Sequence, residues 1–484
     1  MKRVYLDSNI YRYLKINQGN NSSLLFENLI HSKDEIMFYY SYAHLSDLSR
    51  DKTDRKFDDL LFMEQLVDSN FLNLNSDEVF VNVQIASPTC AYNSMNFAPI
   101  NEVVNFQELF EDLEIKEYDS TELRDAKEKI KLIFNMPLSV LGIPNLADSI
   151  EENNPINKLL PALSNNGTFL DLIKGMLNTF HDLYENPTIW REFRNYSINS
   201  LGNKLFNIDV NDNNFNELLK ETPLQKSFLE FVEEIFTHNK SLEKQREYNF
   251  FINSYNCLNI LGLDKEENKK VVFSSFQNDA QHAYYGAHCQ YLVSEDKQLL
   301  FKAKILYKLF GIETKVLNFE EFEELINQNK KKELSFDSFT KSLAEVFENG
   351  SIEEDFEIDN QSKRVLVYRL NHSLFNSFNR LNLIIRKNDS PMYIFYNETN
   401  NYSRFTSFVE FNIIINKIVS VLGTDIKGKN EFTDNDRKSI IEDNWEGRIW
   451  HFQNESFCLE VEQNEKKLCF YYLPLSCANP FAFI

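Results

Sequence analysis

Four aspartates in this chain lie directly after short apolar runs or on predicted helices beside such runs. They are Asp7, Asp47, Asp279 and Asp296. In the folded chain their carboxylate oxygens could converge on one site. Two carboxylates about 4 Å apart repel by roughly 4 kcal/mol at an effective dielectric constant near 20, so a cluster of carboxylates needs a positive charge. Carboxylate oxygens select hard divalent cations such as Mg²⁺ or Mn²⁺. If the four converge, we expect a site for one or two such ions, which in phosphodiester cleavage activate a water molecule and stabilise the leaving oxygen.

Short strands and helices must position these carboxylates, and the sequence around each aspartate predicts them. The runs "RVYLD", "EIMFYY" and "FLNLN" predict three strands, and "SYAHLSDLSR" predicts a helix that has Ser41 as its N-cap and carries Asp47. Much later, a helix with Asp279 precedes the predicted strand "QYLV", and Asp296 follows that strand. In open parallel sheets, ligands gather beyond the carboxyl ends of the strands. We expect two of the four aspartates at such an edge.

The organisation of the chain changes along its length. Residues 1–84 and 271–330 alternate strand and helix, which predicts an α/β sheet, and residues 85–270 between them have long helical patterns separated by Asn- and Pro-containing turns. After a polar linker, residues 335–484 alternate as antiparallel strands do. We therefore expect a parallel-sheet α/β domain that is divided by an all-α insertion and followed by a C-terminal α+β domain of unknown role.

The motifs, taken in order, resemble those of the PIN-domain nucleases. "VYLDSN" is similar to the opening strand and acid of that family, "YYSYAHLSDL" occupies the place of its second acidic motif, and "NDAQHAYYGAHCQYLVSED" occupies that of the third and fourth. The resemblance implies a PIN-like three-layer fold. It also implies the metal ligands Asp7, Asp47, Asp279 and Asp296, with Asn9 and Ser294 as polar supports. Two features depart from the family: the second acid is commonly Glu, and the insertion is far longer than in compact members.

Two histidines and the aspartates themselves also have a purely structural interpretation. His44 lies three residues before Asp47, and His282 lies three residues after Asp279, so on a helix each pair shares a face. The histidines could orient the carboxylates, contact phosphate or transfer a proton, or they could be hydrogen-bonded helix residues without a role in chemistry. In the same way, each aspartate could be a helix cap or a solvated helix position.

The predicted site and the resemblance together imply a Mg²⁺- or Mn²⁺-dependent endonuclease, with RNA as the expected substrate and DNA as the alternative. Analogy extends this to a toxin-like or defence effector. The alternative is a catalytically silent PIN-like scaffold that binds a regulatory protein through the acidic insertion or the C-terminal domain. Phosphatases of the haloacid dehalogenase type also begin with an aspartate after the first strand, but their chemistry needs a second aspartate where this chain has Asn9.

Composition limits the partners. The net charge of −22 excludes binding of nucleic acid through bulk positive charge, so contacts with RNA must be local, metal-assisted or helped by a partner. No apolar stretch approaches the roughly 20 residues of a membrane span, and no apolar run follows "MKRVYLDSN" as it would in an export signal. We therefore expect a cytoplasmic protein without a membrane partner, whose six scattered cysteines are reduced thiols.

Overall fold

A computed structural model describes residues 1–16, 22–75, 77–95, 97, 115–116, 118–140, 167–173, 175, 186–201, 214–237, 244–263, 273–328, 335–358, 363–386, 390–452, 455–462 and 466–474. The chain divides into two compact units. The first comprises Met1–Tyr92, Ala283–Leu300 and Tyr307–Ile484, and the second comprises Asn93–His282 and Phe301–Leu306. The division passes through two helices, α15 (Phe273–Gly286) and α16 (Lys297–Leu309).

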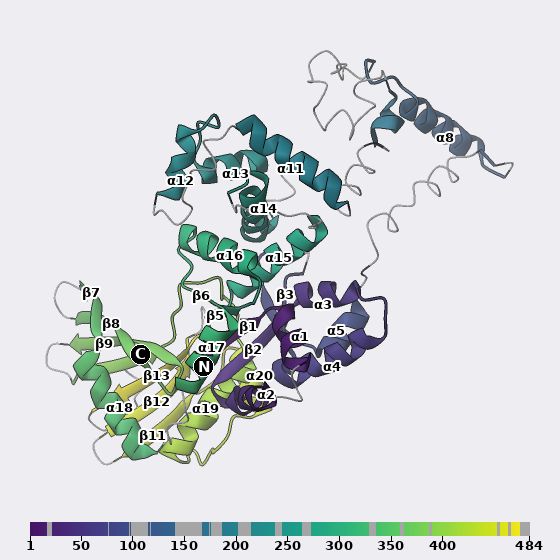
Figure 1. Cartoon of the computed structure of the whole chain (residues 1–484). Helices are drawn as coiled ribbons and strands as arrows, with labels where there is room; N and C mark the ends of the chain where they lie inside the picture. Colours follow the sequence, from purple (N-terminus) through teal and green to yellow (C-terminus); the bar gives the residue numbers. More distant parts are fainter. Residues whose placement is uncertain are drawn as a thin grey trace. The chain divides into compact units, whose positions relative to one another are not determined.

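A six-stranded sheet in the order β4-β3-β2-β1-β5-β6 forms the α/β part of the first unit (Figure 1). Its strands are β1 (Lys2–Leu6), β2 (Ile36–Ser41), β3 (Asn70–Asn73), β4 (Asn82–Ile85), β5 (Tyr291–Val293) and β6 (Lys315–Leu317). All neighbours pair in parallel except β4, which runs antiparallel to β3. The predicted α/β class and the parallel pairing of β1, β2, β3, β5 and β6 are confirmed, and β4 makes the sheet a mixed one. β4 is an addition, because its sequence "NVQI" has no continuous apolar run.

The strand order distinguishes the carboxyl end of β1, because β1 lies between β2 and β5. The chain passes from β1 to β2 on one side of it, and later returns to place β5 on the other side. Such a reversal of strand order is a topological switch point, and ligands bind beyond the carboxyl ends of the strands there. Burial explains why the centre of the sheet forms: all residues of β2, "IMFYYS", are buried, as are the last three of β1.

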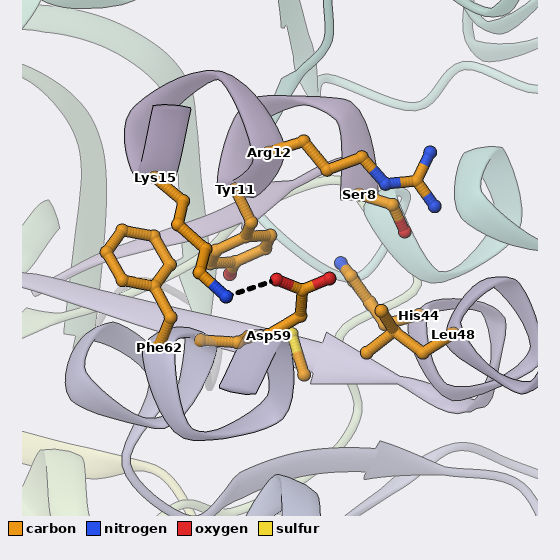
Figure 2. A pocket seen from close by; sticks show the side chains of 9 residues that line it. Ser8, Tyr11, Arg12, Lys15, His44, Leu48, Asp59 and Phe62 are labelled. Atoms are coloured by element: carbon orange, nitrogen blue, oxygen red, sulfur yellow. Dashed lines mark hydrogen bonds and ion pairs between the residues drawn. The ribbon is translucent and has the colours of Figure 1, made fainter. Parts of the chain in front are cut away.

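Helices connect and flank these strands. They are α1 (Ser8–Ile16), α2 (Ser22–His31), α3 (Tyr42–Ser49), α4 (Arg55–Val67), α5 (Pro88–Ser94), α17 (Phe319–Gln328) and the first-unit portions of α15 and α16, with a 3-10 turn η1 (Ser32–Asp34). α1 places Ile10 and Leu14 fully in the core. A small pocket lies between α1, α3 and α4, where Lys15 and Asp59 form an ion pair of 2.5 Å (Figure 2).

A seven-stranded antiparallel sheet in the order β11-β12-β13-β10-β9-β8-β7 forms the rest of the first unit. Its strands are β7 (Ser351–Ile358), β8 (Lys363–Leu374), β9 (Phe378–Arg386), β10 (Met392–Tyr396), β11 (Arg448–Phe452), β12 (Glu455–Val461) and β13 (Leu468–Leu473). The helices are α18 (Phe336–Asn349), α19 (Phe408–Leu422) and α20 (Asp434–Ile441). Aromatic rings fill the core: Phe470 stacks on Phe457, and Phe339 of α18 stacks on Phe375. The predicted antiparallel strands are confirmed.

Buried polar contacts join the two sheets. Nε and Nη2 of Arg3, at the start of β1, donate to the two carboxylate oxygens of Glu410 on α19 at 2.6 and 2.8 Å. The Tyr39 hydroxyl of β2 donates to the same carboxylate at 2.8 Å. Burial alone would raise the pKa of Glu410, but the charge of Arg3 and the hydrogen bonds from Arg3 and Tyr39 together lower it below its ordinary value. The α/β sheet and the antiparallel sheet therefore form one compact unit.

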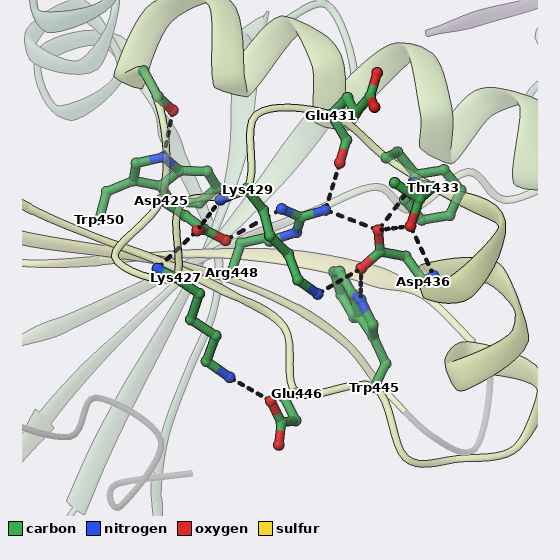
Figure 3. A network of polar contacts seen from close by, with 12 residues as sticks. Asp425, Lys427, Lys429, Glu431, Thr433, Asp436, Trp445, Glu446, Arg448 and Trp450 are labelled. Atoms are coloured by element: carbon green, nitrogen blue, oxygen red, sulfur yellow. Dashed lines mark hydrogen bonds and ion pairs between the residues drawn. The ribbon is translucent and has the colours of Figure 1, made fainter.

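A second buried network lies inside the antiparallel part (Figure 3). Arg448 of β11 is 1 % exposed, and its guanidinium lies 3.2 Å from Asp425 Oδ2 and 2.9 Å from Asp436 Oδ2. Trp445 Nε1 donates to Asp436 at 3.0 Å. Burial alone would raise the pKa of Asp436, but hydrogen bonds from Trp445 and Thr433, and the charge of Arg448, lower it to about 2. The network ties the N-terminus of α20 to β11.

The second unit, in its described part, is built of helices. They are α8 (Thr121–Phe134), α11 (Pro187–Leu201), α12 (Phe215–Leu218), α13 (Phe228–Thr237) and α14 (Arg246–Ile260), a 3-10 turn η4 (Leu219–Glu221) and the second-unit portions of α15 and α16. α14 packs against α11 and α13. Lys302 is buried there, with its ammonium 4.4 Å from the centre of the Phe276 ring. No helix in the described ranges is both long and apolar enough to cross a membrane.

Candidate metal centre

Asp7 stands at the C-terminal end of β1, at the switch point of the sheet, and is only 6 % exposed. Its N–H donates to the Val293 carbonyl of β5 at 2.9 Å. Its Oδ1 accepts from the Ser8 N–H at 2.7 Å, and its Oδ2 accepts from the Ser294 hydroxyl at 2.6 Å. Ser8 is the first residue of α1, so this contact differs from the bond to the second or third helical N–H that a side-chain cap makes. β1, α1 and the residue after β5 together fix the carboxylate.

α3 carries Asp47, six residues after the buried N-cap Ser41. The predicted N-cap Ser41 is confirmed: its hydroxyl accepts from the Ala43 N–H at 3.2 Å, and His44 Nδ1 accepts in return from the Ser41 N–H at 3.1 Å. His44 Nε2 donates to the carbonyl of Leu6, the residue before Asp7, at 2.7 Å. This 1 % exposed histidine therefore ties the helix of Asp47 to the strand of Asp7. These hydrogen bonds hold the His44 ring between α3 and β1.

The structure brings Asp7 and Asp47 together. One carboxylate oxygen of each lies within 4.8 Å of the other. Two unit charges at that separation repel by about 3 to 4 kcal/mol at an effective dielectric constant near 20, and a divalent cation between them would convert this repulsion into attraction. In the part of the chain that the structure describes, no group of three or more potential ligands at this spacing includes Asp279 or Asp296.

Asp296 follows β5 as predicted, and its carboxylate caps a helix. Its Oδ1 accepts from the N–H groups of Gln298 and Leu299 at 2.7 and 3.0 Å, at the start of α16. The Ser294 hydroxyl links it to the centre: this oxygen donates to Asp7 and accepts from the Asp296 N–H at 2.9 Å. One carboxylate oxygen of Asp296 therefore caps α16, as the structural interpretation of this residue predicted. The role of Asp296 as a metal ligand stays a prediction.

The two predicted polar supports, Asn9 and Ser294, form one hydrogen-bonded set. Asn9 Nδ2 donates to the Ser294 hydroxyl oxygen at 3.2 Å, and Asn9 Oδ1 accepts from the Glu295 N–H at 3.3 Å. Ser294 is fully buried. Because Ser294 in turn holds Asp7, the pair orients the carboxylate without any need to touch a ligand.

Asp279 and His282 lie on α15, which is helical as predicted, in the portion that belongs to the second unit. Asp279 is half-buried and His282 is 1 % exposed. The helix continues from His282 directly into its first-unit portion at Ala283. The predicted roles of Asp279 as a ligand and of His282 as a supporting residue stay predictions.

Tyr5 is a neighbour of the site that the sequence did not single out. Its hydroxyl lies 2.6 Å from Ser41 Oγ and 3.3 Å from His44 Nδ1, and burial raises its pKa well above the ordinary value. A neutral tyrosine therefore completes the set of contacts between β1 and the start of α3. The only available signal was its place inside an apolar strand, where a buried hydroxyl must find a partner.

No protein-family model, curated protein sequence or solved structure matches the chain. The resemblance to PIN-domain nucleases therefore stays a prediction from the motifs.

Proposed function

We propose that the protein is a metal-dependent nuclease of PIN type that hydrolyses phosphodiester bonds, with RNA as its expected substrate. The approach of Asp7 and Asp47 within 4.8 Å, at the switch point of a parallel sheet, carries this proposal. A scaffold protein gains nothing from two carboxylates that repel each other, whereas a cation site needs them.

We propose Mg²⁺ or Mn²⁺ as the ion, with Asp7 and Asp47 as ligands. The motifs add Asp279, on α15, and Asp296 as further candidate ligands, with His282 as a supporting residue. A bound cation would lower the pKa of a water molecule and polarise the phosphate.

Neighbouring residues hold the two proposed ligands, Asp7 and Asp47, in place. Ser294 and the Ser8 N–H orient the Asp7 carboxylate, each through one hydrogen bond. His44 holds α3, and with it Asp47, against the end of β1. Such outer contacts keep ligands in a fixed geometry, which is what gives them affinity for one ion.

Thermal unfolding with and without Mn²⁺ or Mg²⁺ tests the ion site, and cleavage of labelled single-stranded RNA, duplex RNA and DNA tests the reaction. We expect millimolar Mn²⁺ to raise the melting temperature of the wild type, and metal-dependent cleavage that EDTA stops. Asp7→Asn should lose both effects. Asp58→Asn is the matched control, since Asp58 is an exposed residue of α4, and it should behave as the wild type.

Three outcomes would contradict the proposal. Absence of a metal-dependent shift would leave the catalytically silent scaffold as the better description. Cleavage that persists in Asp7→Asn would place the activity elsewhere or in a contaminant. A shift that survives in both Asp7→Asn and Asp47→Asn would mean that the ion binds at another site.

A further inference from the structure

A small pocket lies along α1, the helix that begins directly after Asp7. It lies between α1, α3 and α4, has a volume of about 20 Å³, and its lining includes Ser8 and His44, the two residues that contact Asp7 or the residue before it. α1 contributes four lining residues, Ser8, Tyr11, Arg12 and Lys15. Their spacing places them on one face of the helix that begins directly after Asp7.

Tyr11, in the lining of this pocket, has a buried hydroxyl group that lacks a hydrogen-bond partner in the part of the chain that the structure describes. Tyr11 is 6 % exposed, and its oxygen has no hydrogen-bond partner among the described residues. Burial raises its pKa above the ordinary value, so the hydroxyl keeps its proton and can donate it. A buried donor of this kind is normally satisfied. The pocket has room for about one water molecule or one oxygen atom of a ligand.

Two cations line the pocket, and they differ in how they are neutralised. Lys15 forms an ion pair with Asp59 at 2.5 Å. Arg12 is exposed, and within the described ranges no carboxylate pairs with it. In Figure 2 its guanidinium lies on the Ser8 side of the pocket, away from the Lys15–Asp59 pair. An arginine without a carboxylate partner among the described residues is unusual in a chain of net charge −22, where acidic residues outnumber basic ones.

We propose that Arg12 and Tyr11 form a phosphate subsite for a nucleic-acid strand, next to the Asp7–Asp47 pair. This inference rests on the proposed nuclease function and names the contact that this function needs. The planar guanidinium of Arg12 binds two oxygens of one phosphate, and the Tyr11 hydroxyl donates to an oxygen that enters the pocket. A single strong contact of this kind meets the requirement for local binding in an acidic protein.

Binding of a fluorescein-labelled 12-nucleotide single-stranded RNA to the full chain tests the subsite. The measurement uses fluorescence anisotropy in EDTA, which prevents cleavage, at several salt concentrations. Arg12→Ala should weaken binding about tenfold and reduce the slope of log K against log salt by about 0.7, the value for one phosphate contact with a single strand. Arg12→Lys should keep the slope and recover part of the affinity. Tyr11→Phe should weaken binding a few-fold with an unchanged slope.

Arg437→Ala is the control for charge, because it removes the same charge from the half-buried Arg437 of α20, which pairs with Asp434. It should leave affinity and slope unchanged. If Arg12→Ala and Arg437→Ala weaken binding equally, only the total charge matters and the subsite is refuted. The same conclusion follows if Arg12→Ala leaves the salt slope unchanged, if Tyr11→Phe binds RNA as tightly as the wild type, or if the wild type binds no RNA.

The Mn²⁺-dependent rise in melting temperature separates this inference from the proposed function. Arg12→Ala should keep the rise, since Arg12 holds phosphate and not the ion. Loss of the rise in Arg12→Ala would show a general disturbance of the site and overturn the phosphate assignment. RNA binding that depends on Arg12, in a protein without metal response or cleavage, would uphold the subsite and refute the nuclease.

Discussion

The carboxylates of Asp7 and Asp47 lie close enough to repel each other. We expect this repulsion to lower the stability of the metal-free protein. We predict that Asp47→Asn raises the free energy of unfolding in EDTA by about 1 to 3 kcal/mol, because it removes repulsion between the two charges. The same variant should lose the Mn²⁺-dependent increase in stability. Urea unfolding with and without the ion measures both effects, with Asp58→Asn as the control for a charge removed from the surface. A metal-free Asp47→Asn protein that is less stable than the wild type would show that Asp47 is held by favourable contacts instead.

Two substitutions of Asp296 separate its role as a helix cap from its proposed role as a metal ligand. Asparagine caps a helix about as well as aspartate, whereas alanine does not and costs about 0.5 to 2 kcal/mol. We predict that Asp296→Ala lowers the melting temperature in EDTA and that Asp296→Asn does not. If Asp296 is also a ligand, Asp296→Asn will reduce the Mn²⁺-dependent shift without any loss of metal-free stability. Equal destabilisation by both substitutions would contradict the cap.

At the residue scale, the sequence predicted well those side chains whose place follows from local pattern. Asp7 after the first strand, Ser41 as an N-cap and Asp47 on its helix all follow from apolar runs and cap residues nearby. The unsatisfied hydroxyl of Tyr11 did not follow, because it depends on which helices pack around α1. The bond between His44 and the Leu6 carbonyl was equally hidden, since 38 positions separate the two residues.

At the scale of elements, the Arg448 network makes one helix start depend on pH. Asp436, at the N-terminus of α20, has a folded-state pKa of about 2 against an ordinary value of 3.8. A lowered pKa means that its contribution, about 2 kcal/mol, is fully present above pH 5 and is lost as the pH falls from about 4 through 2. We predict that the wild type loses more stability than Asp436→Asn between pH 5 and pH 2.5.

Tryptophan fluorescence during urea unfolding can follow this loss. Two of the three tryptophans in the chain, Trp445 and Trp450, make hydrogen bonds in or beside the network, so the signal reports mainly on the antiparallel part. Equal acid sensitivity of the wild type and Asp436→Asn would contradict the prediction. Asp434→Asn, at an exposed position of the same helix, is the control and should keep the acid sensitivity of the wild type.

Strands with a continuous apolar run were predictable from the sequence. Strands that are defined only by their pairing with a neighbour were less predictable. β1, β2, β3 and β5 were expected, whereas β4, with its polar residues, exists because it pairs along the β3 edge. The order of the seven antiparallel strands was out of reach, since alternation of apolar residues indicates a strand but not its neighbour.

At the scale of the whole first unit, the buried ion pair between Arg3 and Glu410 connects β1 with the antiparallel part. Removal of one partner of such a pair leaves an uncompensated buried charge and costs about 3 to 5 kcal/mol. We predict a loss of this size in Glu410→Ala, which strands the guanidinium of Arg3. Chemical unfolding measures it. Glu446→Ala, which breaks the exposed pair with Lys427, is the control and should change the unfolding curve little.

The double variant Arg3→Met/Glu410→Leu separates charge from packing. It removes both charges and keeps apolar volume, so it should recover much of the stability lost in Glu410→Ala. A double variant as unstable as Glu410→Ala would mean that the joint depends on packing or on Tyr39, and not on the ion pair. No sequence pattern pointed to this ion pair, because Arg3 and Glu410 are 407 positions apart.

The position of β1 between β2 and β5 has a consequence for the way the protein is made. A ribosome adds about 5 to 20 residues each second, and the hydrogen bond between Arg3 and Gln290 spans 287 positions. The first strand therefore waits roughly 15 to 60 s for its second neighbour, with one edge unpaired and open to aggregation. Ser294, which orients the Asp7 carboxylate, emerges just as late. A nascent chain should thus need shelter by a chaperone, and it cannot acquire a finished ion site until more than half of its length has been translated.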